Sequence, residues 1–205
     1  MSVINLLNER LQNKWSFDTT MKIQDEMIPA MLEGKDIVAE SPTGSGKTLA
    51  FMLPILNKVD GSKKKTQALV VAPSQELAMQ IVEVIRQWTE GTDITVQQLI
   101  GGANSARQIE KLKKKPTIVV GTPGRLNELV RQGKLKLKEI ETVVLDECDQ
   151  LLSREYRVVV KSFIEDAAFG RQVVVVSATI TEEIQLVAER LMVEPVAIQI
   201  KPEDL

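Results

Sequence analysis

The chain contains no histidine and a single cysteine among its 205 residues. Without histidine, a Ser-His or Cys-His catalytic pair and a metal site built on imidazole are both excluded. The one cysteine, Cys148, cannot form an internal disulfide, which favours a reducing compartment. No apolar run is long enough to span a membrane, and the N-terminus lacks the apolar core of a signal peptide. We therefore expect a soluble, cytoplasmic protein with no membrane partner.

Aromatic residues are also scarce, at 3% of the chain, although 43% of the residues are hydrophobic. The core must therefore be built on aliphatic side chains. The formal net charge is only −2. Because proteins that bind nucleic acid over a wide surface are usually basic, any nucleic-acid site here must be local. The length suits one domain over residues 1–205.

Short runs rich in valine and isoleucine alternate along the chain with amphipathic segments. Such buried runs are typical of a parallel sheet whose two faces are covered by helices, an α/β fold of about seven strands. We expect strands at 37–39, 68–72, 95–100, 117–120, 142–145, 173–176 and 196–200, and helices at 25–32, 49–59, 75–88, 103–114, 123–131, 155–168 and 182–191.

Three local features have simple interpretations. Asp18, Thr19 or Thr20 could cap the first long helix. The lysines at 63–65 are expected to lie in a solvated loop. Those at 113–115 follow a helix, where positive charge is favourable without any ligand.

The eight residues Ser41–Thr48, Ser-Pro-Thr-Gly-Ser-Gly-Lys-Thr, connect a predicted strand to a predicted helix. This is the context of a phosphate-binding loop, in which glycines allow successive N–H groups to point at an anion. Lys47 could reach the outer phosphates, and the Thr48 hydroxyl could hold Mg²⁺. The usual pattern has glycine where this chain has Ser41. The alternative interpretation is a polar turn followed by a surface lysine.

Two further polar clusters follow predicted strands. Asp146-Glu147 comes after 142–145, and Ser177-Ala178-Thr179 comes after 173–176. Ligands of open α/β sheets bind at the carboxyl ends of strands, where one carboxylate can hold Mg²⁺ and a second can orient water. The alternatives are a solvated turn or a helix cap for the two acids, and a polar strand end for the second cluster.

Asp146-Glu-Cys-Asp149 resembles the D-E-x-D box of the DEAD-box ATP-dependent RNA helicases, with Cys148 in place of the usual alanine. Other segments resemble motifs of that family and come in the same order. They are Gln24, Ser41–Thr48, Pro73-Ser-Gln-Glu-Leu-Ala78, Gly101-Gly102, Thr122-Pro-Gly-Arg125 and Ser177-Ala-Thr179. The resemblance covers residues 15–200 and implies a RecA-like P-loop domain.

The resemblance also implies an ATP site. Gln24 would read the adenine edge and Phe17 would stack on the ring, although Thr20-Met21 stands where the family has Pro-Thr; Phe17 could instead belong to the core. The phosphates would be bound by Ser41, Thr43, Gly44, Ser45, Gly46, Lys47 and Thr48. Thr48 and Asp146 would hold Mg²⁺, and Lys47, Asp146 and Glu147 would be catalytic.

The residues implied to grip single-stranded RNA through its backbone are Pro73, Gln75, Gly101, Gly102, Thr122 and Arg125. Gln75 replaces the family's arginine. Ser177 and Thr179 would couple the RNA site to the ATP site through hydrogen bonds that include Asp149. Alternatively, Gly101-Gly102 is a turn and Arg125 a surface residue at the start of a helix.

As a whole, the chain resembles the N-terminal RecA-like domain of an RNA helicase. The second RecA-like domain, with its arginine-rich motif, has no counterpart in the sequence. We expect a monomer that uses ATP and Mg²⁺, binds RNA, and is nearly inactive without that second domain. Two other classes of function are a non-catalytic ATP- or RNA-binding module and a P-loop small-molecule kinase. The kinase would need an arginine-rich lid, which the sequence lacks.

Overall fold

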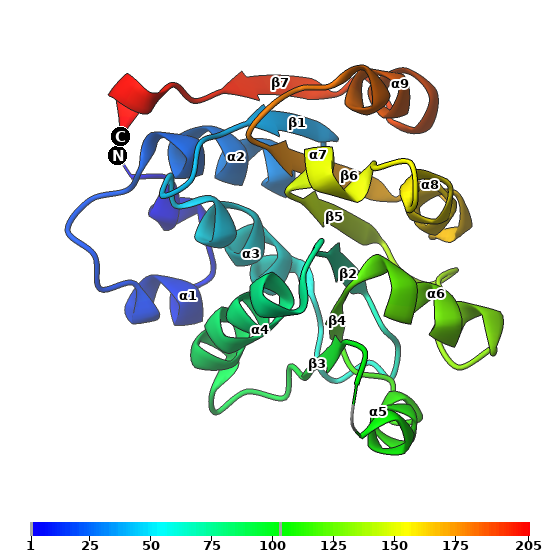
Figure 1. Cartoon of the computed structure of the whole chain (residues 1–205). Coiled ribbons are helices and arrows are strands. Elements are labelled where there is room, and N and C mark those ends of the chain that lie inside the picture. The colour runs from blue at the N-terminus through cyan, green and yellow to red at the C-terminus, as the bar shows by residue number, and fades with distance from the viewer. Residues whose placement is uncertain (1, 103) are drawn as a thin grey trace.

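The computed structural model describes residues 2–102 and 104–205. Over these residues the chain forms one seven-stranded sheet in the order β3-β4-β2-β5-β6-β1-β7, and every neighbouring pair is parallel (Figure 1). The strands are β1 (Ile37–Glu40), β2 (Ala68–Val71), β3 (Val96–Leu99), β4 (Ile118–Gly121), β5 (Thr142–Asp146), β6 (Gln172–Ser177) and β7 (Val196–Gln199). The predicted parallel α/β sheet is confirmed.

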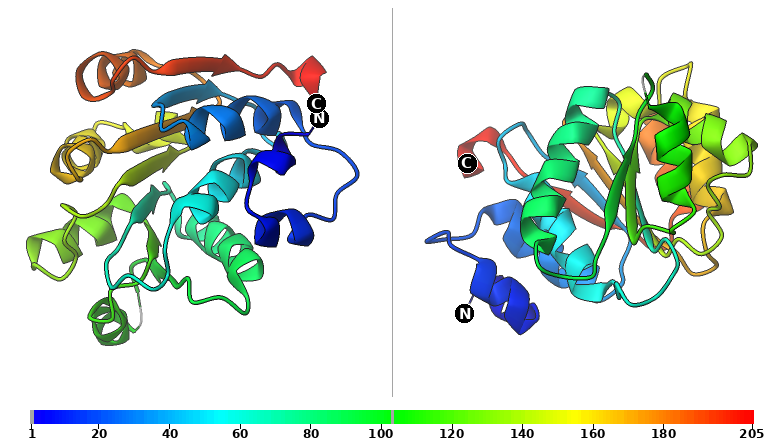
Figure 2. Two further views of the ribbon diagram at one scale, coloured as in Figure 1. Left: turned by 180° about the vertical axis from the view of Figure 1, so that it is seen from behind. Right: turned by 90° about the horizontal axis from the view of Figure 1, so that it is seen from below.

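Helices cover both faces of the sheet (Figure 2). Helices α1 (Glu9–Lys14), α2 (Lys22–Leu32), α3 (Lys47–Lys58) and α4 (Gln75–Thr89) pack on one face. Helices α5 (Ser105–Leu112), α6 (Pro123–Arg131), α7 (Cys148–Leu151), α8 (Arg157–Asp166) and α9 (Glu182–Leu191) pack on the other. Short 3₁₀ turns, η1 (Val3–Leu6) and η2 (Pro202–Asp204), lie near the ends.

Strand β2 shows how the alternation of side chains builds two cores. Ala68 and Val70 belong to the apolar cluster under α2–α4, whereas Leu69 and Val71 belong to the cluster under α5–α9. All four are fully buried. Because successive strand residues point to opposite faces, a continuous apolar run is what a strand covered on both sides requires.

The cap expected for the first long helix needs correction. Helix α2 begins at Lys22, and its N-cap is Met21 rather than Asp18, Thr19 or Thr20. The Met21 N–H donates to the Gln24 side chain at 2.9 Å, so the cap comes from inside the helix. Helix α7 was not expected. The predicted start of a helix at Ala103 lies outside the described residues, and α5 is described from Ser105.

The topology sets the position of the polar strand ends. All seven strands are parallel, so their carboxyl ends lie at one edge of the sheet. Strands β5, β6 and β1 are neighbours there, as are β3, β4 and β2. Among the helices of residues 2–102 and 104–205, none has the length and hydropathy of a membrane span.

Candidate functional site

The glycine-rich loop joins β1 to α3 in the conformation that its sequence predicts. Gly44 and Gly46 both have φ of +81°, in the left-handed region that glycine adopts without strain. Gly46 is the N-cap of α3, so Lys47 is the first residue of the helix. The loop therefore ends at the N–H groups of a helix N-terminus, which attract an anion.

Contacts on three sides fix this loop. The Ser41 N–H donates to the Ser177 carbonyl at 2.8 Å, which ties the loop to the end of β6. Ser41 and Ser45 are hydrogen-bonded through their hydroxyls. The Gln24 amide donates to the Gly46 carbonyl at 3.2 Å. A Cβ on Gly46 would lie 2.6 Å from the Met21 sulfur, so α2 packs directly on the loop.

Asp146 at the end of β5 meets Lys47 across the site. The Lys47 Nζ lies 2.9 Å from Asp146 Oδ1 and 3.9 Å from Glu147 Oε1. The Asp146 side chain is fully buried, whereas 18% of the Lys47 side chain and 36% of the Glu147 side chain are exposed. The residues that the sequence places 99 positions apart, Lys47 and Asp146, therefore form one charged pair.

Burial raises the pKa of Asp146 above its usual value, and the charge of Lys47 offsets only part of that rise. One of its oxygens, Oδ2, is buried and has no hydrogen-bond partner among the described residues. Buried polar atoms are rarely left in this state, and such an atom fits a carboxylate awaiting a ligand. Over the same residues no group of three acidic or cysteine side chains lies together as a metal site. Mg²⁺ is commonly bound by one or two carboxylates together with substrate phosphates, and the unpartnered oxygen of Asp146 fits that chemistry.

The residues after Asp146 are constrained by the turn into α7. Glu147 has φ of +51°, a left-handed conformation that is unfavourable for a residue with a side chain and that is concentrated at functional sites. Cys148 is fully buried, and burial raises the pKa of its thiol. It packs as a small apolar side chain in the core under α5–α9.

Asp149, Ser177 and Thr179 form a connected group beside this turn. The Asp149 N–H donates to the Ser177 hydroxyl, and the Thr179 hydroxyl donates to Asp149 Oδ2, both at 3.0 Å. The hydrogen bonds join the end of β6 to the start of α7. Their role in coupling two sites stays a prediction.

A second group of predicted residues lies at the ends of β2, β3 and β4. The Gln75 amide donates to the Gly101 carbonyl at 3.2 Å, which links the segments after β2 and β3. Gly101 and Gly102 are exposed, and Gly102 has φ of +112°, so they do form a turn. Pro73 and Thr122 are partly exposed at the same edge. The structure thus brings together the segments that sequence resemblance assigns to RNA.

Arg125 is not the surface residue that one interpretation expected, because it is only 6% exposed. Its guanidinium donates to Gln108 at 3.1 Å, to Glu128 at 2.8 Å and to the Ser105 hydroxyl at 3.2 Å. Gln108 in turn donates to the Ile100 carbonyl at 2.9 Å. Arg125 therefore connects α6 to α5 and, through Gln108, to the glycine turn.

Two contributors were missed by sequence reasoning. Gln108 lies in the middle of an amphipathic helix, and only its partial burial, which the sequence does not reveal, distinguishes it from a surface amide. Met21 replaces a polar residue of the family motif, and its packing on Gly46 gave no sequence signal. The interpretation of Phe17 as a core residue is wrong, since Phe17 is 56% exposed. Its ring meets the Trp15 ring edge-on, with centroids 5.0 Å apart.

Comparisons with known proteins agree with this geometry. Residues 21–187 match the family described as DEAD/DEAH box helicase. The chain is 43% identical over 194 residues to a probable ATP-dependent RNA helicase, YfmL, of Bacillus subtilis, covering 93% of this chain and 52% of that protein. It is 45% identical to the DEAD-box ATP-dependent RNA helicase CshC of Bacillus cereus, covering 93% of this chain and 50% of the relative.

Among solved structures, a DEAD box protein from Methanococcus jannaschii superimposes with a TM-score of 0.88 at 30% identity, covering 95% of this chain and 54% of that one. A hypothetical ATP-dependent RNA helicase from Sulfolobus tokodaii gives a TM-score of 0.85 at 32% identity, with coverage of 95% and 57%. The chain thus spans about half the length of the relatives that it matches.

Proposed function

Because this chain belongs to the DEAD/DEAH box helicase family, we propose that it is the ATP-binding N-terminal half of an RNA helicase. In this proposal it binds ATP with Mg²⁺ and grips the backbone of single-stranded RNA without reading its sequence. Hydrolysis stimulated by RNA and duplex unwinding would require a second domain. The observation that carries the proposal is Asp146, a buried carboxylate with one unpartnered oxygen beside Lys47 and the glycine loop.

The residues of the loop would each do part of the binding. The N–H groups at 44–48 and the Lys47 ammonium would hold the phosphates, and Thr48 and Asp146 would hold the metal. When bound, Mg²⁺ neutralises charge on the phosphate oxygens. When ATP binds, the Lys47 ammonium would leave Asp146 and pair with the phosphates. The partial exposure of the Lys47 side chain supports that movement. Glu147, which projects to solvent from a constrained turn, would orient the attacking water.

Base selection would depend on Gln24, whose amide can pair with the adenine edge. Both of its polar ends are engaged in the protein, with the Met21 N–H and the Gly46 carbonyl. A change in the bonds of Gln24 on adenine binding would therefore alter its contact with Gly46 in the glycine loop. Phe17 is exposed and so is available to stack on the ring.

For RNA, we propose that exposed backbone at Gly101-Gly102, with Pro73 and Thr122, makes the phosphate contacts. Gln75 and Arg125 would position these segments, because both already bond to other parts of the protein. Asp149, Ser177 and Thr179 lie beside Glu147 and at the end of β6, which suits them to couple the two sites.

The direct test is substitution of the loop lysine. Lys47→Ala should abolish binding of ATP with Mg²⁺, because the phosphates lose their one cationic side chain in the loop. Lys58→Ala, at the other end of the same helix and exposed, is the matched control and should bind as the wild type does. Calorimetric titration measures both. Equal affinity in wild type and Lys47→Ala would refute the proposed nucleotide site.

A further inference from the structure

Three lysine runs that are far apart in the sequence converge at the edge of the sheet opposite the glycine loop. Residues 63–65, 113–115 and 134–138 each lie in the loop that leads into a strand, namely β2, β4 and β5. These three strands are neighbours in the sheet. The amino ends of parallel strands share one edge, so the three runs must meet there.

Backbone bonds hold the three loops together. The Gln67 N–H donates to the Thr117 carbonyl at 2.8 Å, and the Glu141 N–H donates to the Gln67 carbonyl at 2.9 Å. The run at 134–138 alternates strictly: Leu135 and Leu137 are buried, at 4% and 5% exposure, so the lysines between and beside them face solvent. The backbone that carries the lysines is therefore held in place by these hydrogen bonds and by the buried leucines.

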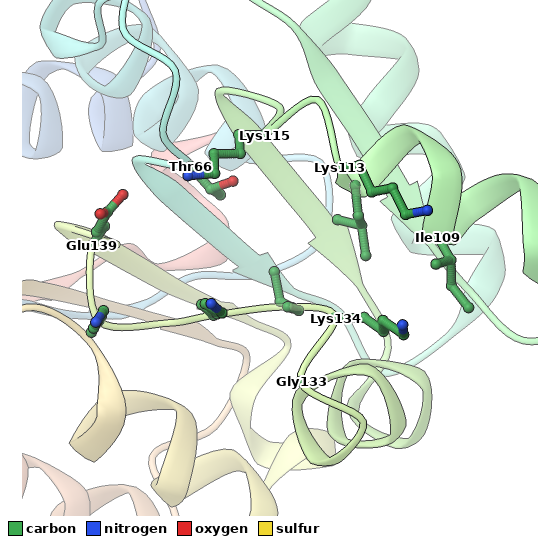
Figure 3. Close-up of a pocket in the computed structure, with 11 residues that line it drawn as sticks. Thr66, Ile109, Lys113, Lys115, Gly133, Lys134 and Glu139 are labelled. Atoms are coloured by element: carbon green, nitrogen blue, oxygen red, sulfur yellow. The ribbon is translucent and has the colours of Figure 1, made fainter.

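The loops enclose a pocket of about 370 Å³ (Figure 3). We call it the lysine pocket, because five lysines lie on its rim: Lys113, Lys115, Lys134, Lys136 and Lys138. The run at 63–65 borders it, since Lys64 shares a second hollow with Lys113 to Lys115. One carboxylate, Glu139, also lines the pocket.

Most of this charge is unpaired. Lys113 pairs with Glu110 at 2.9 Å on an exposed surface. Among residues 2–102 and 104–205, no carboxylate lies within ion-pair distance of Lys115, Lys134, Lys136 or Lys138. In a chain whose net charge is −2, such a gathering of like charges repels itself until an anion neutralises it.

A helix C-terminus explains only the lysines at 113–115, and a solvated loop explains only those at 63–65. Neither explains why the run at 134–138 closes the same pocket.

We propose that the lysine pocket binds the phosphate backbone of RNA, as a second contact for a strand that also occupies the glycine-turn edge. This inference rests on the proposed function. Lysine is a flexible point charge that suits phosphates without reading bases. Specific protein interfaces are instead depleted in lysine and use apolar anchors. Leu112 and Leu135 in the floor of the pocket are only 6% and 4% exposed, so neither projects as an apolar anchor.

Helix α5 supplies the path between the two contacts. It begins beside the segment of the glycine turn and ends at Leu112, directly before the lysines of the pocket. Its eight residues span about 12 Å. Arg107 and Lys111 are exposed and lie four residues apart on one face of the helix, where they line a separate hollow with Arg86. Ile109 and Leu112, on another face, line the lysine pocket. An RNA strand leaving the turn would therefore meet positive charge on one side of α5 and reach the pocket at the C-terminal end of the helix.

The test measures RNA affinity against salt concentration for the whole chain. The triple variant K113Q/K115Q/K136Q removes three charges from the pocket. The control K14Q/K35Q/K201Q removes three exposed lysines elsewhere and gives the same net charge. Two labelled single-stranded RNAs are compared by fluorescence anisotropy. One of roughly 6 nucleotides is expected to cover the glycine-turn edge only, and one of roughly 20 nucleotides is expected to reach the lysine pocket as well.

For the longer RNA, the pocket variant should lower the slope of log affinity against log salt by about 2, or roughly 0.7 per lost phosphate contact. The short RNA should bind wild type, pocket variant and control alike. Thermal melting establishes that both variants are folded, as expected for exposed lysines.

Identical binding of the longer RNA by pocket variant and control would overturn the pocket assignment and leave the proposed function intact. Failure of the wild type to bind either RNA would overturn both. Polyglutamate serves as a probe for an acidic protein partner. If the pocket variant binds polyglutamate more weakly than the control does, while both bind the longer RNA equally, the pocket is assigned to an acidic protein partner instead.

Discussion

Asp146 shows a conflict between stability and function in a single side chain. It is fully buried, burial raises its pKa, and one oxygen has no partner among the described residues. A carboxyl whose pKa is higher in the folded than in the unfolded chain makes the fold less stable as pH rises through that interval. At neutral pH the charged form is therefore the costly one. In the proposed function, Asp146 would nevertheless have to be charged to hold the metal.

We therefore expect Asp146→Asn to raise the stability of the nucleotide-free chain at neutral pH, by about 1 kcal/mol, because a neutral amide of similar shape replaces a carboxylate whose charged form burial disfavours, and the partly exposed Lys47 ammonium can turn to water. The same variant should lose the effect of Mg²⁺ on ATP affinity. Urea denaturation and calorimetry with and without Mg²⁺ measure the two effects. A destabilised variant that keeps its metal dependence would contradict this view of Asp146.

At the scale of elements, the glycine loop is defined by its contact with the start of α2. Gly44 and Gly46 share φ of +81°, but their surroundings differ. A Cβ on Gly44 would meet nothing within 4 Å, whereas one on Gly46 would lie 2.6 Å from the Met21 sulfur and 2.8 Å from the Gln24 amide nitrogen. Comparing alanine substitutions at Gly44 and Gly46 therefore separates the cost of backbone strain from the cost of steric contact.

Gly44→Ala should cost about 1 kcal/mol of stability, the usual penalty for a left-handed residue with a side chain. Gly46→Ala should cost more, because the new methyl group must also push aside the side-chain ends of Met21 and Gln24. Adding Met21→Ala to Gly46→Ala should recover part of the difference, which a double-mutant cycle in urea would measure. If both alanine variants lose equal stability, α2 does not pack tightly on the loop in solution.

For the whole molecule, the carboxyl edge of the sheet is divided between two groups. The ends of β5, β6 and β1 carry the phosphate loop, the acidic pair and the Ser177–Thr179 segment, while the ends of β2, β3 and β4 carry the predicted RNA segments. The chain spans about half of its relatives. In P-loop enzymes an arginine from outside this set of residues is worth on the order of 10³–10⁵ in turnover.

We therefore expect residues 1–205 alone to show little phosphate release and little stimulation by single-stranded RNA. The corresponding second domain of a relative, added covalently or in trans, should raise turnover, because in the proposed function it would supply such an arginine and a surface that closes on RNA. Steady-state phosphate release measures both. Strong RNA stimulation of this chain alone, abolished by Glu147→Gln, would show instead that its active site is complete.

The sequence by itself determined the sheet and the conformation of the glycine loop, because both depend on local patterns. Continuous Val/Ile runs such as 173–176 can be buried on both sides only in a covered parallel sheet, and Gly44 and Gly46 permit a turn that other residues resist. The same local reasoning misplaced the cap of α2: the helix begins at Lys22 after Met21, whose N–H bonds the Gln24 side chain, and the Thr20 hydroxyl bonds the Asp25 carboxylate instead of capping the helix.

Only the tertiary structure decided which distant residues meet. It buried Arg125 against α5, left Phe17 exposed, and set Lys47 against a carboxylate from another strand. It also gathered three lysine runs, each unremarkable alone, at one edge. The physical reason is strand order: the sequence specifies where each strand begins and ends, but packing of the two cores decides that β4, β2 and β5 lie side by side.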